Sequence, residues 1–178
     1  MNEYYADARE LKNIRHKFRA GDRVFLSGEV FTARDAAHKR MFEYISSGKT
    51  LPFNIDGAVI YYAGPTPAPY GMPIGSAGPT TSARMDVYTP ALLDMGLLAT
   101  IGKGERNGEV INSIIKNGSV YFCALGGAGA LACRHIKECE VIGFDDLGCE
   151  SVKRLIFENF PLIVGIDSRG NNIFAKNI

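Results

Sequence analysis

The sequence predicts a single α/β domain, because strand-like segments alternate with segments of helical periodicity along the chain. We expect strands at residues 23–30, 58–62, 97–101, 119–124, 141–144 and 162–167, and helices at 34–47, 86–95, 107–116 and 150–157. The chain has 178 residues, 46% of them hydrophobic, which is enough for one sizeable core.

The first segments support this assignment in order. Residues 1–20 are a polar N-terminal extension that we expect to be partly helical, since Leu11, Ile14 and Phe18 fall at helical spacing. Residues 23–30 then alternate between the two faces of a strand.

The helix expected at 34–47 places Ala37, Met41 and Ile45 on one face. Thr32 is expected to cap it, and Gly48 to end it.

A long segment rich in proline and glycine, residues 63–79, separates the next strand from the helix at 86–95. Such a segment is too long for a simple connector, and long loops in compact domains tend to be functional. Later, the strand at 97–101 leads into Gly102-Lys103-Gly104, and the glycine run 126–129 is expected to open a short helix or tight turn. That run could bind a phosphate, but it lacks the full spacing of a nucleotide-binding loop.

Composition narrows the class of protein. The net charge is +1, with 20 basic and 19 acidic residues, which argues against a nucleic-acid-binding face. We expect a cytoplasmic protein with no membrane span, since there is neither a signal-like apolar segment near the start nor an apolar run of about 20 residues. The four cysteines lack the spacing of a metal site, so we predict reduced, partly buried thiols and no metal held by this chain.

Three cations lie at positions that favour the binding of an anion. Arg34 and Arg84 each fall in the first turn of an expected helix, where the helix dipole disfavours a positive charge unless an anion binds there. Lys103 follows a strand directly, and ligands of α/β sheets bind at such strand ends. The alternative is that these residues are ordinary solvated cations.

The sequence shows no convincing Ser-His-Asp arrangement, paired carboxylates in a loop or metal-ligand spacing. An anion site without catalytic groups suggests a subunit that completes a site built mainly by another protein.

Several segments, in this order, resemble the beta subunit, or C-terminal domain, of iron–sulfur class I fumarate hydratases and L(+)-tartrate dehydratases. The segments are Thr32–Arg40, Tyr61–Pro65, Gly78–Asp86, Ile101–Gly104, Phe144–Glu150 and Val164–Ser168. The resemblance implies that residues 21–178 form a swivelling β/β/α domain.

The resemblance also implies an activity: the reversible hydration of fumarate to (S)-malate on a 4Fe-4S cluster carried by a separate alpha subunit. It implies an alpha2beta2 assembly, and the chain alone is expected to be inactive and to form a homodimer. The alternatives are an L(+)-tartrate dehydratase beta subunit, which would convert tartrate to oxaloacetate and water, and a non-catalytic binding or assembly module.

The same resemblance assigns roles to residues. Three cations are implied to bind the substrate carboxylates: Arg34, Arg84 and Lys103. Thr80 is implied to act beside the reacting carbon, as a proton acceptor or as a hydrogen-bonding partner of the substrate. Three further residues are expected to support the site from behind: His38, Thr81 and Asp86.

Overall fold

The computed structural model describes residues 1–125 and 129–175. Within these ranges, the strands are β1 Glu3–Asp7, β2 Arg23–Thr32, β3 Val59–Tyr61, β4 Ala99–Gly102, β5 Val120–Cys123, β6 Ile136–Gly143 and β7 Val152–Ile166. The α-helices are α1 Leu11–Ile14, α2 Asp35–Ser46, α3 Thr89–Asp94, α4 Gly108–Asn117 and α5 Gly129–Ala132. Short 3₁₀ turns cover Ala8–Glu10, Arg15–Lys17, Ser82–Met85, Cys133–His135 and Asp145–Glu150. Most of the glycine run 126–129 lies outside the described residues, and α5 begins at its last glycine.

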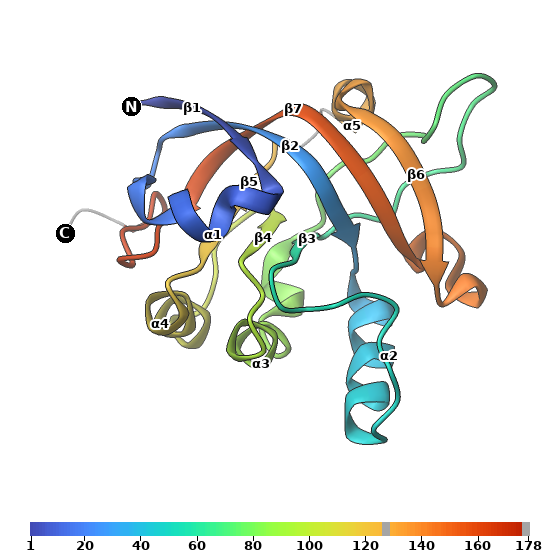
Figure 1. Ribbon diagram of the computed structural model, residues 1–178, viewed down its shortest axis with the longest axis horizontal. Coiled ribbons are helices and arrows are strands. Elements are labelled where there is room, and N and C mark those ends of the chain that lie inside the picture. Colours follow the sequence, from blue (N-terminus) through green and yellow to red (C-terminus); the bar gives the residue numbers. More distant parts are fainter. Residues whose placement is uncertain (126–128, 176–178) are drawn as a thin grey trace.

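The chain is one compact α/β domain built on a closed sheet. Strands β2, β3, β4 and β5 are parallel neighbours, and β7 runs antiparallel to both β5 and β2, which closes the ring. Strand β1 adds to β2, and β6 adds to β7. Figure 1 shows α2, α3 and α4 on one side of this sheet, below it in the view, and α5 on the other side.

Two apolar clusters hold these layers together. One lies within the closed sheet and includes Leu26, Tyr61 and Phe122. The other includes Met41 of α2 and Ile60 of β3, and it packs the helices against the outside of the sheet. Neighbouring residues of β3 therefore enter different clusters, as the two-residue repeat of a strand requires.

The predicted helix at 150–157 is wrong, because residues 152–166 form the long strand β7. This strand pairs with β2 on one side and with β6 and then β5 on the other, so it is largely buried. Lys153 and Arg154 interrupt the polar–apolar alternation at the start of β7, and the spacing of Val152, Leu155 and Ile156 also fits one face of a helix. The sequence also failed to predict β1, which lies beside β2 at the edge of the sheet. The strand expected at 141–144 is longer and lies earlier, as β6.

Thr32 does not cap α2, contrary to the prediction. Its hydroxyl donates to the Ser151 carbonyl at 3.3 Å and accepts from the Lys153 N–H at 3.0 Å, so it joins β2 to β7. The N-cap position of α2 is Arg34. At the other end, Gly48 adopts a left-handed φ of 68°, as expected of a residue that ends a helix.

The segment 63–79 forms a loop whose base is packed and whose tip is exposed. The Tyr61 hydroxyl donates to the Ala77 carbonyl at 2.5 Å, and the Thr66 N–H donates to the Ser76 carbonyl at 3.1 Å. Residues 66–73 are all exposed. Across the described ranges, no helix is long and apolar enough to span a bilayer.

Candidate anion-binding site

The candidate site lies where three parallel strands end side by side. Thr32 of β2 pairs with Tyr61 of β3, and Tyr61 pairs with Ile101 of β4. Arg34 therefore leaves the end of β2 close to where Lys103 leaves the end of β4. This register brings residues from distant parts of the chain to one edge of the sheet.

The segment after the long loop returns to the same edge. The Thr80 N–H donates to the Tyr62 carbonyl at 2.7 Å, and Thr81 forms a β-bridge with Lys103. Arg84 follows within the 3₁₀ turn Ser82–Met85 rather than in the first turn of an α-helix. The structure thus places all four predicted substrate-contacting residues on loops at this edge.

Arg34 has an extended backbone, and its guanidinium is only partly satisfied. Nη2 lies 3.1 Å from Oε1 of Glu150, while Nε lies 3.8 Å from Oδ2 of Asp35. Nε is buried and has no hydrogen-bond partner among the described residues. Gly64 leaves room for the group, because a Cβ there would lie 2.7 Å from Arg34 Nη1.

Arg84 is linked to Arg34 through a shared carboxylate. Its Nη2 lies 2.9 Å from Oδ2 of Asp35, the same oxygen that faces Arg34. The Arg84 side chain is 51% exposed, so most of its donors face solvent. Without a ligand, the two guanidiniums are thus held by internal carboxylates.

Lys103, Thr80 and Thr81 present polar groups without internal partners. Lys103 and Thr81 are exposed and Thr80 is half-buried. In the described part of the chain, the Lys103 ammonium has no carboxylate within ion-pair distance, and neither threonine hydroxyl makes a hydrogen bond. Two hydroxyls and an ammonium group are therefore available to an incoming ligand.

His38 lies one turn after Arg34 and is completely buried. Its Nδ1 lies 3.0 Å from the Arg34 carbonyl and donates to it, and the ring contacts Tyr62 and Tyr88. Burial lowers the pKa of His38 from 6.5 to about 4, so the ring is neutral at pH 7. His38 supports the backbone at Arg34 and does not act as a cation.

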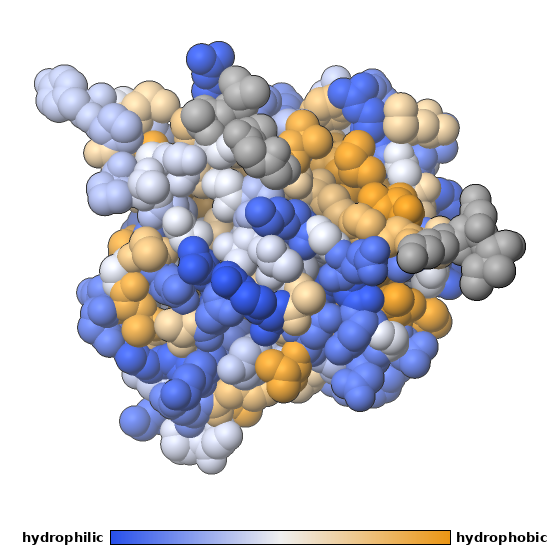
Figure 2. Space-filling model, turned by 180° about the vertical axis from the view of Figure 1, so that it is seen from behind, coloured by the Kyte–Doolittle hydropathy of each residue, from blue (hydrophilic) through white to orange (hydrophobic). Residues whose placement is uncertain are grey.

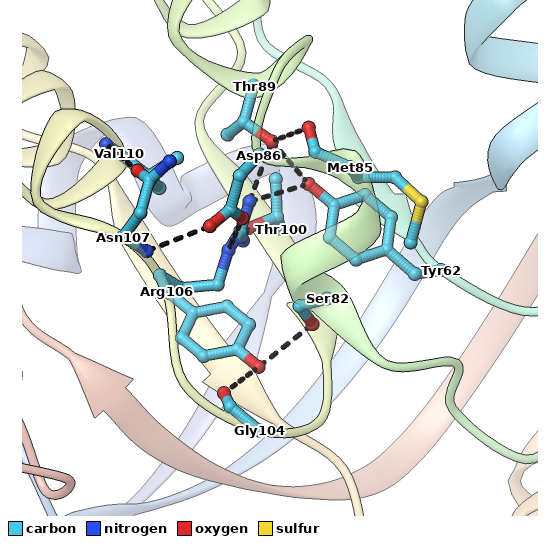
Figure 3. A network of polar contacts seen from close by, with 11 residues as sticks. Tyr62, Ser82, Met85, Asp86, Thr89, Thr100, Gly104, Arg106, Asn107 and Val110 are labelled. Atoms are coloured by element: carbon cyan, nitrogen blue, oxygen red, sulfur yellow. Dashed lines mark hydrogen bonds and ion pairs between the residues drawn. The ribbon is translucent and has the colours of Figure 1, made fainter.

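Asp86 points into the protein, where it pairs with an arginine that the sequence did not single out. Arg106 Nε lies 2.6 Å from Asp86 Oδ1, and the Asn107 N–H donates to Oδ2 at 2.8 Å. Arg106 Nη2 also donates to Thr89 Oγ1 at 2.7 Å (Figure 3). No local pattern signals this pair, because its members are twenty residues apart and meet only in the fold.

The same network fixes the segment that carries Lys103. The Ser82 N–H donates to the Lys103 carbonyl at 2.9 Å, and the Tyr121 hydroxyl donates to the Gly104 carbonyl at 2.8 Å. Ser82 Oγ in turn lies 2.9 Å from the Tyr121 hydroxyl. Gly102 has no room for a side chain there, since a Cβ would clash with Ser82 and Tyr62.

The residues present do not fit an iron–sulfur cluster. In the described ranges, no three His, Cys, Asp or Glu side chains gather into a group that could hold a metal. The four cysteines form no disulfide; Cys149 is exposed and the other three are half-buried. Burial raises the pKa of the Cys123 and Cys139 thiols, which disfavours the thiolate form that a metal binds.

Three cavities of about 270, 320 and 430 Å³ lie in the described part of the molecule away from the candidate site, and none of them is lined by Arg34, Arg84 or Lys103. Figure 2 shows the rear face of the molecule, where hydrophilic side chains predominate and apolar ones form separate patches.

Comparison with known proteins gives one family. The model for the fumarase C-terminus matches residues 4–177. The chain is 40% identical over 156 residues to fumarate hydratase 1, mitochondrial, of Leishmania major, which covers 86% of this chain but only 28% of that relative. It is 38% identical over 180 residues to the putative L(+)-tartrate dehydratase subunit beta of Methanocaldococcus jannaschii, covering 98% of this chain and 92% of that one. It is 31% identical to the L(+)-tartrate dehydratase subunit beta of Escherichia coli, with 96% and 84% coverage. The chain thus spans little more than a quarter of the fumarate hydratase but most of each tartrate dehydratase subunit, and it belongs to the fumarase C-terminus family.

Proposed function

We propose that this chain is the beta subunit of a two-subunit iron–sulfur hydro-lyase that reversibly hydrates fumarate to (S)-malate. In this proposal it supplies the residues that bind the substrate carboxylates to a site that an alpha subunit completes. The observation that carries the proposal is the convergence of Arg34, Arg84 and Lys103 at the ends of β2, β3 and β4 in a chain of this family.

The chemistry of these groups suits a dicarboxylate. Guanidinium and ammonium groups form charge-assisted hydrogen bonds with carboxylates, and two arginines beside a lysine can hold both ends of a short diacid. When a proton leaves the carbon next to a carboxylate, negative charge develops on that carboxylate, and fixed cations stabilise it. We assign Thr80 to the reacting carbon, and His38, Thr81 and Asp86 to the support of these groups.

We place the 4Fe-4S cluster on the alpha subunit, since the described residues of this chain offer no suitable ligands. The names of two relatives as beta subunits support a partner. We further propose an alpha2beta2 assembly in the cytoplasm and a homodimer of the chain alone. In this proposal the closed sheet and its helices are the family's swivelling β/β/α domain, with residues 1–20 as an extension.

The main alternative is an L(+)-tartrate dehydratase beta subunit, which would convert tartrate to oxaloacetate and water. A specific observation favours it: the relatives that match most of their own length carry that name. A non-catalytic module of the same fold is the third candidate.

Mixing this chain with its reconstituted alpha subunit tests all three. We expect hydration of fumarate, followed by absorbance, that requires both chains. Dehydration of L(+)-tartrate with no turnover of fumarate would favour the alternative. Inactivity of the assembled pair on both substrates would leave the non-catalytic module.

A further inference from the structure

We propose that Glu150 is a positioning residue that orients Arg34 for the substrate carboxylate; this rests on the proposed function. Glu150 ends the 3₁₀ turn Asp145–Glu150, far from Arg34 in the sequence. This turn belongs to a segment that resembles the family, yet the resemblance assigns no role in the site to any of its residues.

The two oxygens of Glu150 make separate contacts at the start of α2. Oε2 accepts from the Ala36 N–H at 2.8 Å, and Oε1 lies 3.1 Å from Arg34 Nη2. The first N–H groups of a helix lack partners within the helix, and the helix dipole favours a carboxylate there. Glu150 therefore caps α2 from outside while holding the guanidinium that leaves the cap position.

The turn that carries Glu150 is itself tied down. The buried Lys153 Nζ donates to the carbonyls of Gly148 and Cys149, each at 3.1 Å, and to Ser151 Oγ at 2.7 Å. Ser151 Oγ donates to the Gly148 carbonyl at 2.7 Å. Glu150 thus approaches Arg34 from a fixed backbone, which is what a residue that orients another side chain needs.

The consequence for Arg34 is a restricted guanidinium. Gly64 lies against one side of it and Glu150 holds Nη2, so the rotamers of the side chain are restricted before a ligand arrives. Pre-ordering a flexible side chain reduces the entropy lost on binding. Glu150 is therefore expected to lower the KM for the substrate, although it carries the same charge as the carboxylate that binds.

The chain offers a matched control on the same two elements. Asp146 lies in the same turn, and its carboxylate pairs with Arg40 of α2 at 2.8 Å. This pair also links the turn to α2, but it lies away from Arg34. Asp146→Asn therefore removes a contact between the same elements without touching the site.

The first measurement is the KM and kcat of the assembled enzyme with Glu150→Gln, Glu150→Ala and Asp146→Asn. Gln keeps an oxygen for the Ala36 N–H but loses the charge that holds Arg34. We expect both Glu150 variants to raise KM about tenfold, the scale of one hydrogen bond to a charged group, with little change in kcat. Only Glu150→Ala should also lower the thermal midpoint. Asp146→Asn should leave KM unchanged.

Two kinetic outcomes would overturn the proposal. An unchanged KM in Glu150→Gln would mean that Glu150 only caps the helix. A lower KM in that variant would mean that Glu150 competes with the substrate for Arg34.

A second measurement does not depend on the enzyme activity. The Arg34 Nε–H signal is followed by NMR in the full chain alone and assigned with Arg34→Lys. It should be slow to exchange in the wild type and in Asp146→Asn, and broadened or shifted in Glu150→Gln. If the Arg34 signal changes in this way but the wild-type assembly is inactive, the proposed function would be wrong, whereas Glu150 would still orient Arg34. An Arg34 Nε–H signal that is unchanged in Glu150→Gln would overturn that role, whatever the enzyme activity.

Discussion

Two arginine–aspartate pairs lie within the same region of this fold and differ in almost every physical respect. In the pair of Arg106 and Asp86, the side chains are 0% and 7% exposed and the contact is 2.6 Å. In the pair of Arg84 and Asp35 they are 51% and 41% exposed, and the contact is 2.9 Å. Arg106 has further internal acceptors in Thr89 and Thr100, whereas most of the Arg84 donors face solvent.

This difference in burial and pairing distinguishes residues that stabilise the fold from residues that are available to a ligand. Charges taken out of water need complete pairing, so a saturated buried pair holds chain segments together and has nothing left to offer a ligand. A half-exposed pair contributes little to stability and can exchange its partner for an incoming carboxylate. Arg106 therefore fixes the loops, whereas Arg84 and Arg34 are the residues that we propose bind a ligand at their edge.

The largest expected effect is on the buried pair. We expect Arg106→Ala to reduce the free energy of unfolding by about 3–5 kcal/mol, because it leaves the Asp86 carboxylate buried without its cation. Chemical denaturation of the chain measures this change. Arg154→Ala, at a half-exposed arginine that pairs with glutamates on the sheet surface, should leave the denaturation midpoint close to that of the wild type. Equal effects of the two variants would contradict the conclusion that the buried pair stabilises the fold more than exposed ion pairs do.

His38 lies close to both pairs, and its protonation at acid pH should have the next largest effect on stability. Its folded-state pKa of about 4 lies below 6.5, so between these values the unfolded chain binds more protons and stability falls as the pH falls. Full protonation of His38 is expected to reduce the free energy of unfolding by about 3 kcal/mol. This loss of stability is absent above pH 6.5 and complete below pH 4.

The measurement is the unfolding free energy of the wild type and of His38→Gln from pH 7 to 4. The variant should show a smaller slope in this window, whatever its stability at pH 7. Other groups close to the ring are Arg34, Asp35, Arg106 and the two tyrosines. Parallel slopes for the two proteins would show that His38 does not titrate as a buried group.

The exposed cations should affect activity without affecting stability. We expect Arg84→Ala and Lys103→Ala each to lower kcat/KM of the assembled enzyme by about 2 kcal/mol of transition-state binding, or about thirtyfold. The unfolding free energy of the chain should change by less than about 1 kcal/mol. Lys39→Ala, an exposed lysine of α2, is the control for a general loss of positive charge. A near-wild-type kcat/KM would remove the substituted residue from the site.

Much of the fold follows from local patterns in the sequence. Helix α4 was predicted at 107–116 from its apolar stripe, and in the structure Asn107 caps this helix and Gly118 ends it. The first part of β7 was wrongly predicted as a helix, whereas its last residues agree with the strand predicted at 162–167; the pairing of the first part with β2 and β6 arises only in the closed sheet. The closure of β7 onto β2 is a long-range pairing with no local signature.

The same distinction between local patterns and long-range contacts applies to the candidate site. Arg34, Arg84 and Lys103 could be singled out because a cation at a helix start or a strand end conflicts with local preference unless an anion binds. Asp86 was expected to support the site, but its partner Arg106 and the acceptor Glu150 are identified only by three-dimensional contacts. In the proposed site, a conflict with local preference thus marks the residues that would face a ligand, whereas Arg106 and Glu150 carry no such local signal.

The smallest expected effect tests whether the exposed pair is as loosely held as the comparison suggests. Asp35 places one oxygen between Arg34 and Arg84, so its charge offsets part of the positive potential that a dianion would meet. We expect Asp35→Asn to change the unfolding free energy by less than about 1 kcal/mol and to lower KM about twofold. The KM effect should shrink as salt is raised, because these groups are screened by ions. Glu43→Gln, on the exposed face of α2, controls for net charge. A rise in KM would instead mean that Asp35 orients Arg84 as Glu150 orients Arg34, and both carboxylates would then belong to the positioning framework of the site.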